Sequence, residues 1–369
     1  MHIIADLLSV RNDGSAGGAT GFAIGLINSM LERGGVTVTA MCRPESKDFL
    51  RKKLGKQARI KSVESCKIFG MAFALKRAGD ILFCPFGSID FYNKKIPTIS
   101  CILDIQHEFY PHFFSEQELV HRRKFYSQIV KKADAVVCIS DYTRNTFCGK
   151  YGYPPENSYT IYIPVPQYEN RPSDVLERFG LEKERFFLYA ANFWKHKNHI
   201  RLLEAYGRLA EKYGDIYKLV LTGNSLDNRS VEEKIKEMGL SGSVVITGYI
   251  EDGDIKKLID NAKGIVYPSL FEGFGIPVIE AMDAGRMIAC SNATCLPEIG
   301  SDAIYYFNPE DVGEMEEGLR YLAENQMNAE IMESYQKKLS LYDRDKITNQ
   351  YLKLFEYVLH SRRDCEKRK

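Results

Sequence analysis

The sequence predicts an α/β fold in which two doubly wound parallel sheets form two domains. Short apolar segments bounded by glycine alternate with amphipathic helical segments along the whole chain. The apolar segments are continuous rather than alternating, as expected for strands that are buried on both faces. The length of 369 residues favours two domains over one.

The elements follow one another in strand–helix order. In the first half the expected strands are 2–8, 36–42, 80–86, 98–103 and 135–140, and the helices include 20–34 and 116–133. In the second half the strands are 186–191, 217–223, 244–250, 264–269, 286–291 and 303–308, with helices at 199–214, 230–239, 253–262 and 277–285. Three prolines in YIPVPQYENRPSD (162–174) favour an extended crossing between the halves. The expected domains are therefore 1–166 and 167–345, followed by a last helix and charged tail at 346–369.

Composition narrows the class of protein. No apolar run reaches the roughly 18 residues that a membrane span needs. The first residues, MHIIADLLSVRNDG, lack the basic region of a signal peptide, and Asp6 interrupts their apolar stretch, so we expect a cytoplasmic protein. Nine scattered cysteines without Cys-x-x-Cys spacing indicate reduced thiols rather than a zinc site.

Charge is divided unevenly between the halves. Residues 1–168 carry 22 Lys and Arg against 15 Asp and Glu, whereas the remainder carries 28 against 34. A basic first half suggests phosphates or an acidic lipid surface as its partner, although chance variation is an equal alternative. The basic segment LRKKLGKQARIK (50–61) could contact anionic headgroups at the inner face of a membrane, or could be a solvated face. We expect no nucleic-acid partner.

The most informative stretch is FEGFGIPVIEAMDAG (271–285), in which Glu272 and Glu280 bracket a glycine loop. Gly273 and Gly275 do not suit a helix, but a proline suits a first helical turn. A helix is therefore expected from near Ile276 to Ala284, with a glycine C-cap after it. The free N–H groups and positive dipole end of such a helix bind phosphate well.

This geometry predicts a ligand with three parts. A sugar would lie near Glu272, phosphates at the loop of Gly273, Phe274 and Gly275, and a ribose near Glu280, because carboxylates accept hydrogen bonds from hydroxyl groups. The alternative is that Glu272 is an ordinary turn residue and Glu280 a solvent-facing helix residue.

The first half contains two candidate segments. In RNDGSAGGAT (11–20), Gly17 and Gly18 precede a helix and could expose backbone N–H groups to a phosphate or admit an acceptor, or could form a bare turn. The strand before DIQHEFY (104–110) is buried, so Asp104 and His107 fall at its carboxyl end, where sites form. His107 could instead be a capping or surface residue.

Two other motifs have structural explanations. Ser140 precedes a helix and is best explained as its N-cap. Asp252-Gly253-Asp254 resembles a metal-binding Asp-x-Asp, but it also opens an amphipathic helix, where capping explains it. The sequence therefore requires no metal.

Glu272 and Glu280 with their spacing, followed by PEIGSDAIYYFNPED (297–311), closely resemble the motif of glycosyltransferase family 4, retaining enzymes of the GT-B fold. The resemblance covers most of the chain and includes FFLYAANFWKHKNHIRLLEAY (186–206). It implies that Glu280 holds the nucleotide ribose, Glu272 the donor sugar and Lys197 the diphosphate. It also implies that 347–360 crosses back to the first domain.

The resemblance extends to the first half, with departures. The family's glycine loop faces the donor diphosphate and the acceptor, a position matched by Gly17 and Gly18. Many members have His-Asp where this chain has Leu103-Asp104, so Asp104 matches the aspartate and the sugar-contacting histidine is displaced to His107. Many also carry an arginine where this chain has Asn192, a cation that Lys195 or His196 could replace.

The expected function is transfer of a sugar from a GDP- or UDP-sugar, with mannose from GDP favoured, to a glycan or lipid-linked acceptor in surface polysaccharide synthesis. No further cofactor is required. Two alternatives remain open. One is a nucleotide-sugar-binding subunit with weak or no catalysis. The other is a different GT-B enzyme, such as an epimerase or a phosphorylase.

Overall fold

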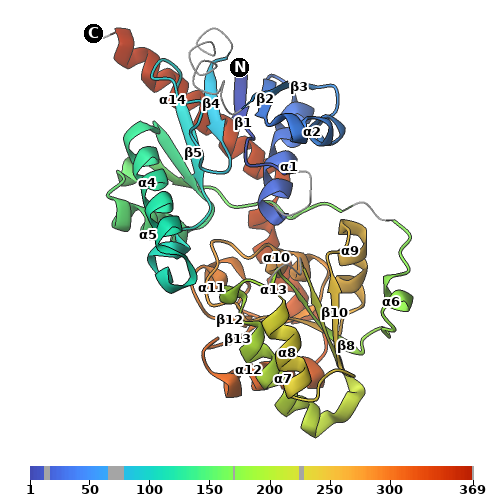
Figure 1. Cartoon of the computed structure of the whole chain (residues 1–369). Coiled ribbons are helices and arrows are strands. Elements are labelled where there is room, and N and C mark those ends of the chain that lie inside the picture. Colours follow the sequence, from blue (N-terminus) through green and yellow to red (C-terminus); the bar gives the residue numbers. More distant parts are fainter. Residues whose placement is uncertain (12–16, 65–78, 169–170, 224–227, 368–369) are drawn as a thin grey trace. The chain divides into compact units, whose positions relative to one another are not determined.

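The computed structural model describes residues 1–11, 17–64, 79–168, 171–223 and 228–367, which divide into two compact units (Figure 1). The first unit comprises Met1–Pro164 together with Tyr342–Lys369, and the second is Val165–Leu341. The expected boundaries were 166/167 and 345/346.

A seven-stranded parallel sheet forms the centre of the first unit, in the order β3-β2-β1-β4-β5-β6-β7. Its strands are β1 His2–Asp6, β2 Thr37–Cys42, β3 Ala58–Ser62, β4 Ile81–Cys84, β5 Thr98–Ile102, β6 Ala135–Cys138 and β7 Ser158–Thr160. Its helices are α1 Gly17–Arg33, α2 Lys47–Leu54, α4 Glu116–Lys132, α5 Asp141–Tyr151 and α14 Arg344–Lys367. The short 3-10 turns are Pro44–Ser46, Gln106–Glu108, Pro111–Phe113 and Pro155–Asn157.

A six-stranded parallel sheet forms the centre of the second unit, in the order β10-β9-β8-β11-β12-β13. Its strands are β8 Phe186–Ala190, β9 Lys218–Thr222, β10 Val244–Gly248, β11 Gly264–Tyr267, β12 Met287–Ser291 and β13 Tyr305–Phe307. Its helices are α6 Val175–Arg178, α7 His199–Tyr213, α8 Arg229–Glu237, α9 Asp252–Asn261, α10 Ile276–Asp283, α11 Leu296–Ile299, α12 Val312–Glu324 and α13 Ala329–Leu339. Three 3-10 turns complete the trace: Lys195–Lys197, Gly214–Ile216 and Ser340–Tyr342.

The predicted fold class is confirmed, because both sheets are parallel and carry helices between their strands. The central strands are buried throughout; Phe186, Phe187 and Leu188 of β8 expose no surface. Two strands escaped prediction, β3 (ARIKS) and β7 (SYT). Both are edge strands with polar residues, and an edge strand needs no continuous apolar run.

The C-terminal helix α14 packs within the first unit. Its Thr348 side chain lies 2.7 Å from Ser29 Oγ of α1, and Tyr351 meets the ring of Phe83 from β4 at 5.8 Å between centroids. Arg362 near its end bonds Asp134 at 2.6 Å. Figure 1 shows α14 running beside β4 and β5. None of the described helices is long and apolar enough to cross a bilayer.

The strand orders locate the switch points. In each sheet the chain adds strands first towards one edge and then towards the other. This change of side falls between β1 and β4 in the first unit, and between β8 and β11 in the second. In open parallel sheets, ligands bind beyond the carboxyl ends of the strands at such points.

Candidate functional site

Lys197 and Glu272 meet at the switch point of the second sheet. Lys197 ends the 3-10 turn that follows β8, and Glu272 lies in the loop that follows β11. Lys197 Nζ donates to Glu272 Oε1 at 2.6 Å, and the hydroxyl of Tyr267, the last residue of β11, donates to the same oxygen at 2.9 Å. The ion pair is nearly enclosed, since each of the two side chains is 12% exposed.

The electrostatics favour a charged pair. Burial, the largest single cause, would raise the pKa of Glu272, but Lys197, His196 and a hydrogen bond from Ser269 together outweigh it, and the pKa lies below its usual value. The Lys197 Nζ atom also lies 5.6 Å from the centre of the Tyr267 ring, which adds a cation–π contact. A cation with two polar partners and a little exposed surface is suited to bind an anion that displaces its carboxylate.

Side-chain hydrogen bonds from Tyr189 and Asn198 fix the backbone of the loop that carries Lys197. Tyr189 Oη donates to the carbonyl of Lys197 at 2.8 Å. Asn198, in the left-handed conformation at φ +62°, donates through Nδ2 to the carbonyls of Pro268 and Pro309 at 3.0 and 2.7 Å. Asparagine tolerates this conformation better than most residues. The side chain of Lys197 therefore starts from a rigid point.

The glycine loop leads into α10, which begins at Ile276 as the sequence predicted. Gly275 has φ +102°, and a Cβ there would lie 2.7 Å from Leu296 Cδ2, so only glycine fits without strain. The Phe274 side chain is buried, and Cys295 Sγ donates to the carbonyls of Glu272 and Phe274 at 3.2 and 3.3 Å. Gly273 completes the turn between them.

Glu280 lies on the second turn of α10 and is only 8% exposed, so it is not a solvent-facing residue. Its Oε1 accepts a hydrogen bond from the hydroxyl of Tyr168. Burial is the main cause that raises the pKa of Glu280 to about 7, and the Asp252 carboxylate adds to it, although the Tyr168 hydrogen bond opposes them. A buried carboxyl poised near neutrality is a common feature of functional sites.

Asn192 occupies the loop after β8, close to the end of β9. A Cβ on Gly223 would approach the Ala191 carbonyl oxygen to 2.3 Å and the Asn192 Cα to 2.9 Å, so a glycine is required for this packing. Of the two expected substitute cations, His196 is neutral at pH 7 in the ligand-free protein, because burial lowers its pKa to about 4. Lys195 is exposed.

In the first unit, Asp104 lies just beyond β5. Its Oδ1 accepts from the Gln106 backbone N–H at 2.9 Å, and its carbonyl accepts from Tyr126 Oη at 2.6 Å. Asp104 lines a pocket of about 580 Å³ between the ends of β4 and β5 and the first turns of α4. The other lining residues are Phe86, Gly87, Cys101, Leu103, Gln117, Glu118, His121, Arg122, Phe125 and Tyr126.

His107 is fully buried and does not line that pocket. Its Nε2 lies 2.8 Å from Tyr151 Oη, and its ring stacks on Tyr126 at 5.1 Å. Burial lowers its pKa to about 4, so the ring is neutral at pH 7. In this conformation His107 has no surface to offer a ligand.

Gly17 and Gly18 form the exposed start of the 17-residue helix α1. Gly17 has φ +48°, and a Cβ there would meet no atom of the described residues within 4 Å. Gly14 of the same motif lies outside the described residues.

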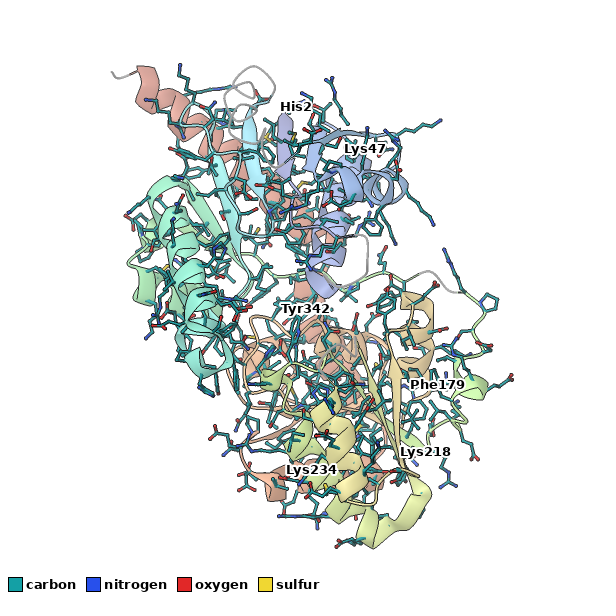
Figure 2. The ribbon with its side chains drawn as sticks, in the orientation of Figure 1. His2, Lys47, Phe179, Lys218, Lys234 and Tyr342 are labelled. Carbon is teal, nitrogen blue, oxygen red and sulfur yellow. The ribbon has the colours of Figure 1, made fainter. Side chains whose placement is uncertain are left out.

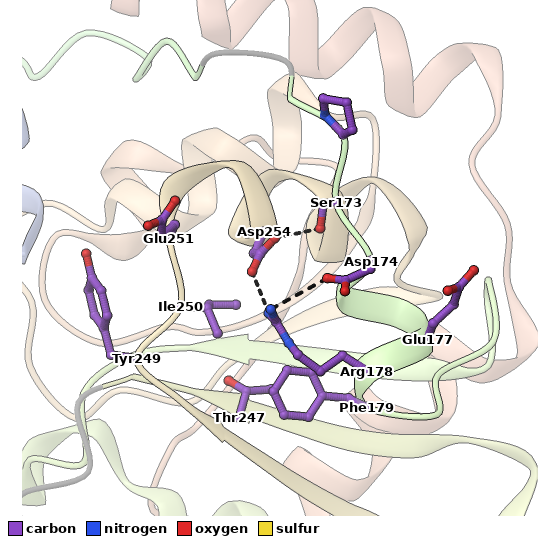
Figure 3. A pocket seen from close by; sticks show the side chains of 11 residues that line it. Ser173, Asp174, Glu177, Arg178, Phe179, Thr247, Tyr249, Ile250, Glu251 and Asp254 are labelled. Atoms are coloured by element: carbon purple, nitrogen blue, oxygen red, sulfur yellow. Dashed lines mark hydrogen bonds and ion pairs between the residues drawn. The ribbon is translucent and has the colours of Figure 1, made fainter.

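A second pocket, of about 900 Å³, lies beside the end of β10 in the second unit (Figure 3). Asp254 accepts from Ser173 Oγ at 2.6 Å and pairs with Arg178, and these contacts tie the segment before β8 to α9. Asp254 is thus a structural residue of the first turn of α9. The predicted capping by Asp252-Gly253-Asp254 is wrong, because the N-cap is Glu251 and the two aspartates lie inside the helix. Among the described residues, no group of three or more His, Cys, Asp or Glu side chains could hold a metal.

Two residues that contact Glu272 and Glu280 were not predicted from the sequence. Tyr267 was counted only as a strand residue, yet its hydroxyl binds Glu272. Tyr168 lies in the proline-rich segment, more than a hundred residues before Glu280, and no local pattern links the two.

Part of the second unit matches a known protein family. Residues 175–339 match the family described as "Glycosyl transferases group 1". The chain is 31% identical over 210 residues to O-antigen chain mannosyltransferase B of Escherichia coli, and 27% identical over 209 residues to O-antigen chain mannosyltransferase RfbU of Salmonella typhimurium. These matches cover 55% and 56% of this chain, which spans the same 55% and 56% of the two relatives' lengths.

Solved structures share the fold over nearly the whole chain. A crystal structure of Anabaena HepE in complex with UDP and glucose superposes with a TM-score of 0.77 at 17% identity, covering 96% of this chain and 99% of that one. A sucrose-phosphate synthase of Thermosynechococcus elongatus superposes with a TM-score of 0.75 at 17% identity, covering 98% and 100%. The architecture of two parallel sheets therefore matches the GT-B fold of these structures.

Proposed function

We propose that this chain is a group 1 glycosyl transferase, supported by the family match of residues 175–339, and that it transfers a sugar from a nucleotide-diphospho-sugar to a glycan or lipid-linked acceptor. The observation that carries the proposal is the Lys197–Glu272 ion pair beside the glycine-led start of α10, at the switch point of the second sheet. This is where an open parallel sheet binds its ligand.

The proposed donor site uses three charged side chains. The donor diphosphate would take over Lys197 from Glu272, assisted by the N–H groups at the start of α10. Glu272, released from the ion pair, would accept hydrogen bonds from the sugar hydroxyls, and Glu280 would accept them from the ribose. When the glycosidic bond breaks, the departing nucleoside diphosphate gains negative charge that the Lys197 ammonium stabilises.

We propose that the anomeric configuration is retained and that the acceptor attacks from the face of the departing diphosphate. Glu272 is the carboxylate nearest the donor in this scheme, and we assign it to hydroxyl binding because Lys197 and Tyr267 both direct their protons to the same Oε1. Trapping a glycosyl group covalently on any side chain would overturn this route.

The acceptor would bind in the first unit. Asp104 and its pocket lie beyond β5, and Gly17 and Gly18 begin α1, which follows β1 in the chain. The pocket combines aromatic rings with polar groups of both signs, a lining suited to a sugar ring and its hydroxyls. We propose that Asp104 contacts the acceptor there, and that His107 supports this wall through Tyr126 rather than touching the sugar.

We further propose that the sugar is mannose, used in surface polysaccharide synthesis. The support is the similarity to two O-antigen chain mannosyltransferases. The base is proposed as guanine or uracil; the solved HepE structure contains UDP.

A calorimetric titration panel with GDP, UDP, ADP and TDP tests the donor site. We expect one of GDP or UDP to bind at micromolar strength equally well in magnesium and in EDTA, because Lys197 and the start of α10 supply the positive charge. Transfer from the matching sugar nucleotide would then be followed with mannosylated acceptors. Failure of all four to bind would contradict the proposal, and binding only with magnesium would contradict the metal-free site.

A nucleotide-sugar-binding subunit without turnover is the second candidate, favoured by Asn192 in place of the family's usual arginine. It predicts that the donor binds with normal affinity but is neither transferred nor hydrolysed with any acceptor. An epimerase would convert the donor sugar without an acceptor, and a phosphorylase would require inorganic phosphate. Analysis of the reaction products therefore distinguishes the transferase, the inactive binding subunit, the epimerase and the phosphorylase.

We also propose that the first unit associates peripherally with anionic membrane at the cytoplasmic face. Helix α2, the strand β3 and the turn between them carry the exposed basic side chains Arg51, Lys52, Lys53, Lys56 and Arg59. In Figure 2, the side chains around Lys47, at the start of α2, extend outward. Clustered basic residues contribute about 1 kcal/mol each to binding an acidic leaflet.

This association predicts that the protein sediments with vesicles containing phosphatidylglycerol and not with pure phosphatidylcholine, and that added salt releases it. Changing Lys52 and Lys53 to glutamate should abolish sedimentation. The same two changes at Lys256 and Lys257 of α9, in the second unit, should have no effect. Equal sedimentation of both double variants would contradict the proposed surface.

A further inference from the structure

The carboxylate of Glu280 has a single described side-chain partner, although its side chain is almost fully buried. The hydroxyl of Tyr168 donates to Oε1. None of the described residues donates a hydrogen bond to Oε2, and this atom is not fully buried. One oxygen of the carboxylate is therefore held, and the other remains for a hydroxyl group from a ligand.

Tyr168 is well suited to hold that oxygen. Burial and the Glu280 carboxylate raise the pKa of the Tyr168 phenol far above its usual value, so the phenol keeps its proton and must be the donor. The Asp252 carboxylate, in the first turn of α9, also raises the pKa values of both groups. The Tyr168 hydrogen bond is thus the described contact that favours the ionised form of Glu280 against burial and against Asp252.

Rotation of a carboxylate by a few tens of degrees would misdirect its free lone pairs. Within an eight-residue helix, the Glu280 side chain could adopt more than one rotamer, and a hydrogen bond from a separate segment selects one of them. Such a bond from outside α10 both orients the carboxylate and favours its charged form.

We propose that Tyr168 is a positioning residue of the donor site: its hydroxyl holds Glu280 Oε1 so that Oε2 is aimed at a ribose hydroxyl of the bound nucleotide. The proposal rests on the proposed function for the identity of the ligand. Tyr168 acts through Glu280 and need not touch the nucleotide. The opposing possibility is that Tyr168 occupies the place of the ribose and must leave before the donor binds.

The test compares the wild-type protein with Tyr168→Phe, which removes the hydroxyl and keeps the ring. The ligands are GDP and UDP together with their 2′,3′-dideoxy counterparts, titrated by calorimetry. We expect Tyr168→Phe to weaken binding of the ribonucleotide by about tenfold, the usual effect of losing a hydrogen bond to a charged group. The dideoxy ligand should bind both proteins equally, because it lacks the hydroxyls from which Glu280 would accept hydrogen bonds.

A matched control is available in the same unit. Tyr213 also donates to a carboxylate, that of Glu324, but on the surface of α7 and α12. Tyr213→Phe should leave the binding of every ligand unchanged. Equal weakening of both ligand types by Tyr168→Phe would overturn the proposal, and tighter binding of the ribonucleotide would show that Tyr168 is an obstructing residue instead.

A second measurement needs no ligand. The infrared band of the protonated Glu280 carboxyl, identified by its loss in Glu280→Gln, would be followed through a pH titration. We expect the midpoint to lie higher in Tyr168→Phe than in the wild type, since the phenol stabilises the carboxylate. An unchanged midpoint would overturn the hydrogen bond itself. If the midpoint moves but neither GDP nor UDP binds the wild type, the proposed function fails while the coupling of Tyr168 to Glu280 stands.

Discussion

Replacing Lys197 with methionine is expected to lower kcat for sugar transfer by about 100- to 1,000-fold, the usual effect of removing one group that stabilises developing charge. Methionine keeps an unbranched side chain of similar length but loses the ammonium group. KM should rise less than kcat falls, because the nucleoside diphosphate carries more charge as it departs than when it is bound in the intact donor. Steady-state kinetics with the donor found by calorimetry measure both constants.

The same change has a structural cost that must be separated from catalysis. Without Lys197 the nearly buried Glu272 loses the cation that lowers its pKa, and unfolding by urea should show a loss of a few kcal/mol. The double variant Lys197→Met with Glu272→Gln should recover stability but not kcat. Lys234→Met is the control, because Lys234 forms surface ion pairs with Glu204 and Glu237 on the same unit. A kcat unchanged in stable Lys197→Met would contradict the assigned role.

Donor binding is expected to strengthen as pH rises through about 7. Glu280 is half-protonated near that pH in the free protein, whereas ribose hydroxyls donate to its ionised form. Below pH 7 binding must therefore release a proton, and affinity should rise by up to about tenfold per pH unit before levelling off above pH 8. Calorimetry in two buffers with different ionisation enthalpies measures the released proton directly.

Glu280→Gln should remove this pH dependence and weaken binding at pH 8, where the wild type carries a charged carboxylate. The buried Asp6 of the first unit also has its pKa raised to about 7, mainly by burial, so Asp6→Asn is the control and should retain the wild-type profile. His196 and His199 cannot supply the dependence, since burial lowers their pKa values to about 4 and 3. A pH profile unaltered in Glu280→Gln would contradict the assignment.

The contribution of Glu280 to stability should fall as pH rises, whereas donor binding should strengthen. The folded protein holds a proton on Glu280 up to about pH 7, whereas an unfolded glutamate releases it near pH 4.5. Glu280 should therefore stabilise the fold fully below pH 4.5, and this contribution should be lost as pH rises towards 7. Ligand-free unfolding of the wild type and Glu280→Gln at several pH values would show the difference.

Local patterns were sufficient for most of the fold. Continuous apolar runs identified the central strands, and Gly275 with Pro277 placed the start of α10 correctly at Ile276. The edge strands β3 and β7 escaped because an edge strand can be short and polar. His107 shows the limit for single residues: a histidine at the end of a strand can face a pocket or the core, and packing against Tyr126 and Tyr151 places this one in the core.

From its residues alone, this chain specifies two parallel sheets, the glycine loop before α10 and the types of side chain that surround it, because these depend on periodicity and on backbone preferences over a few positions. Which of those side chains meet depends on strand order. Lys197 and Glu272 are 75 positions apart and are brought together because β8 and β11 are neighbours in the sheet. Tyr168 reaches Glu280 across 112 positions, and the pKa of that carboxyl is raised by burial, which no local pattern records.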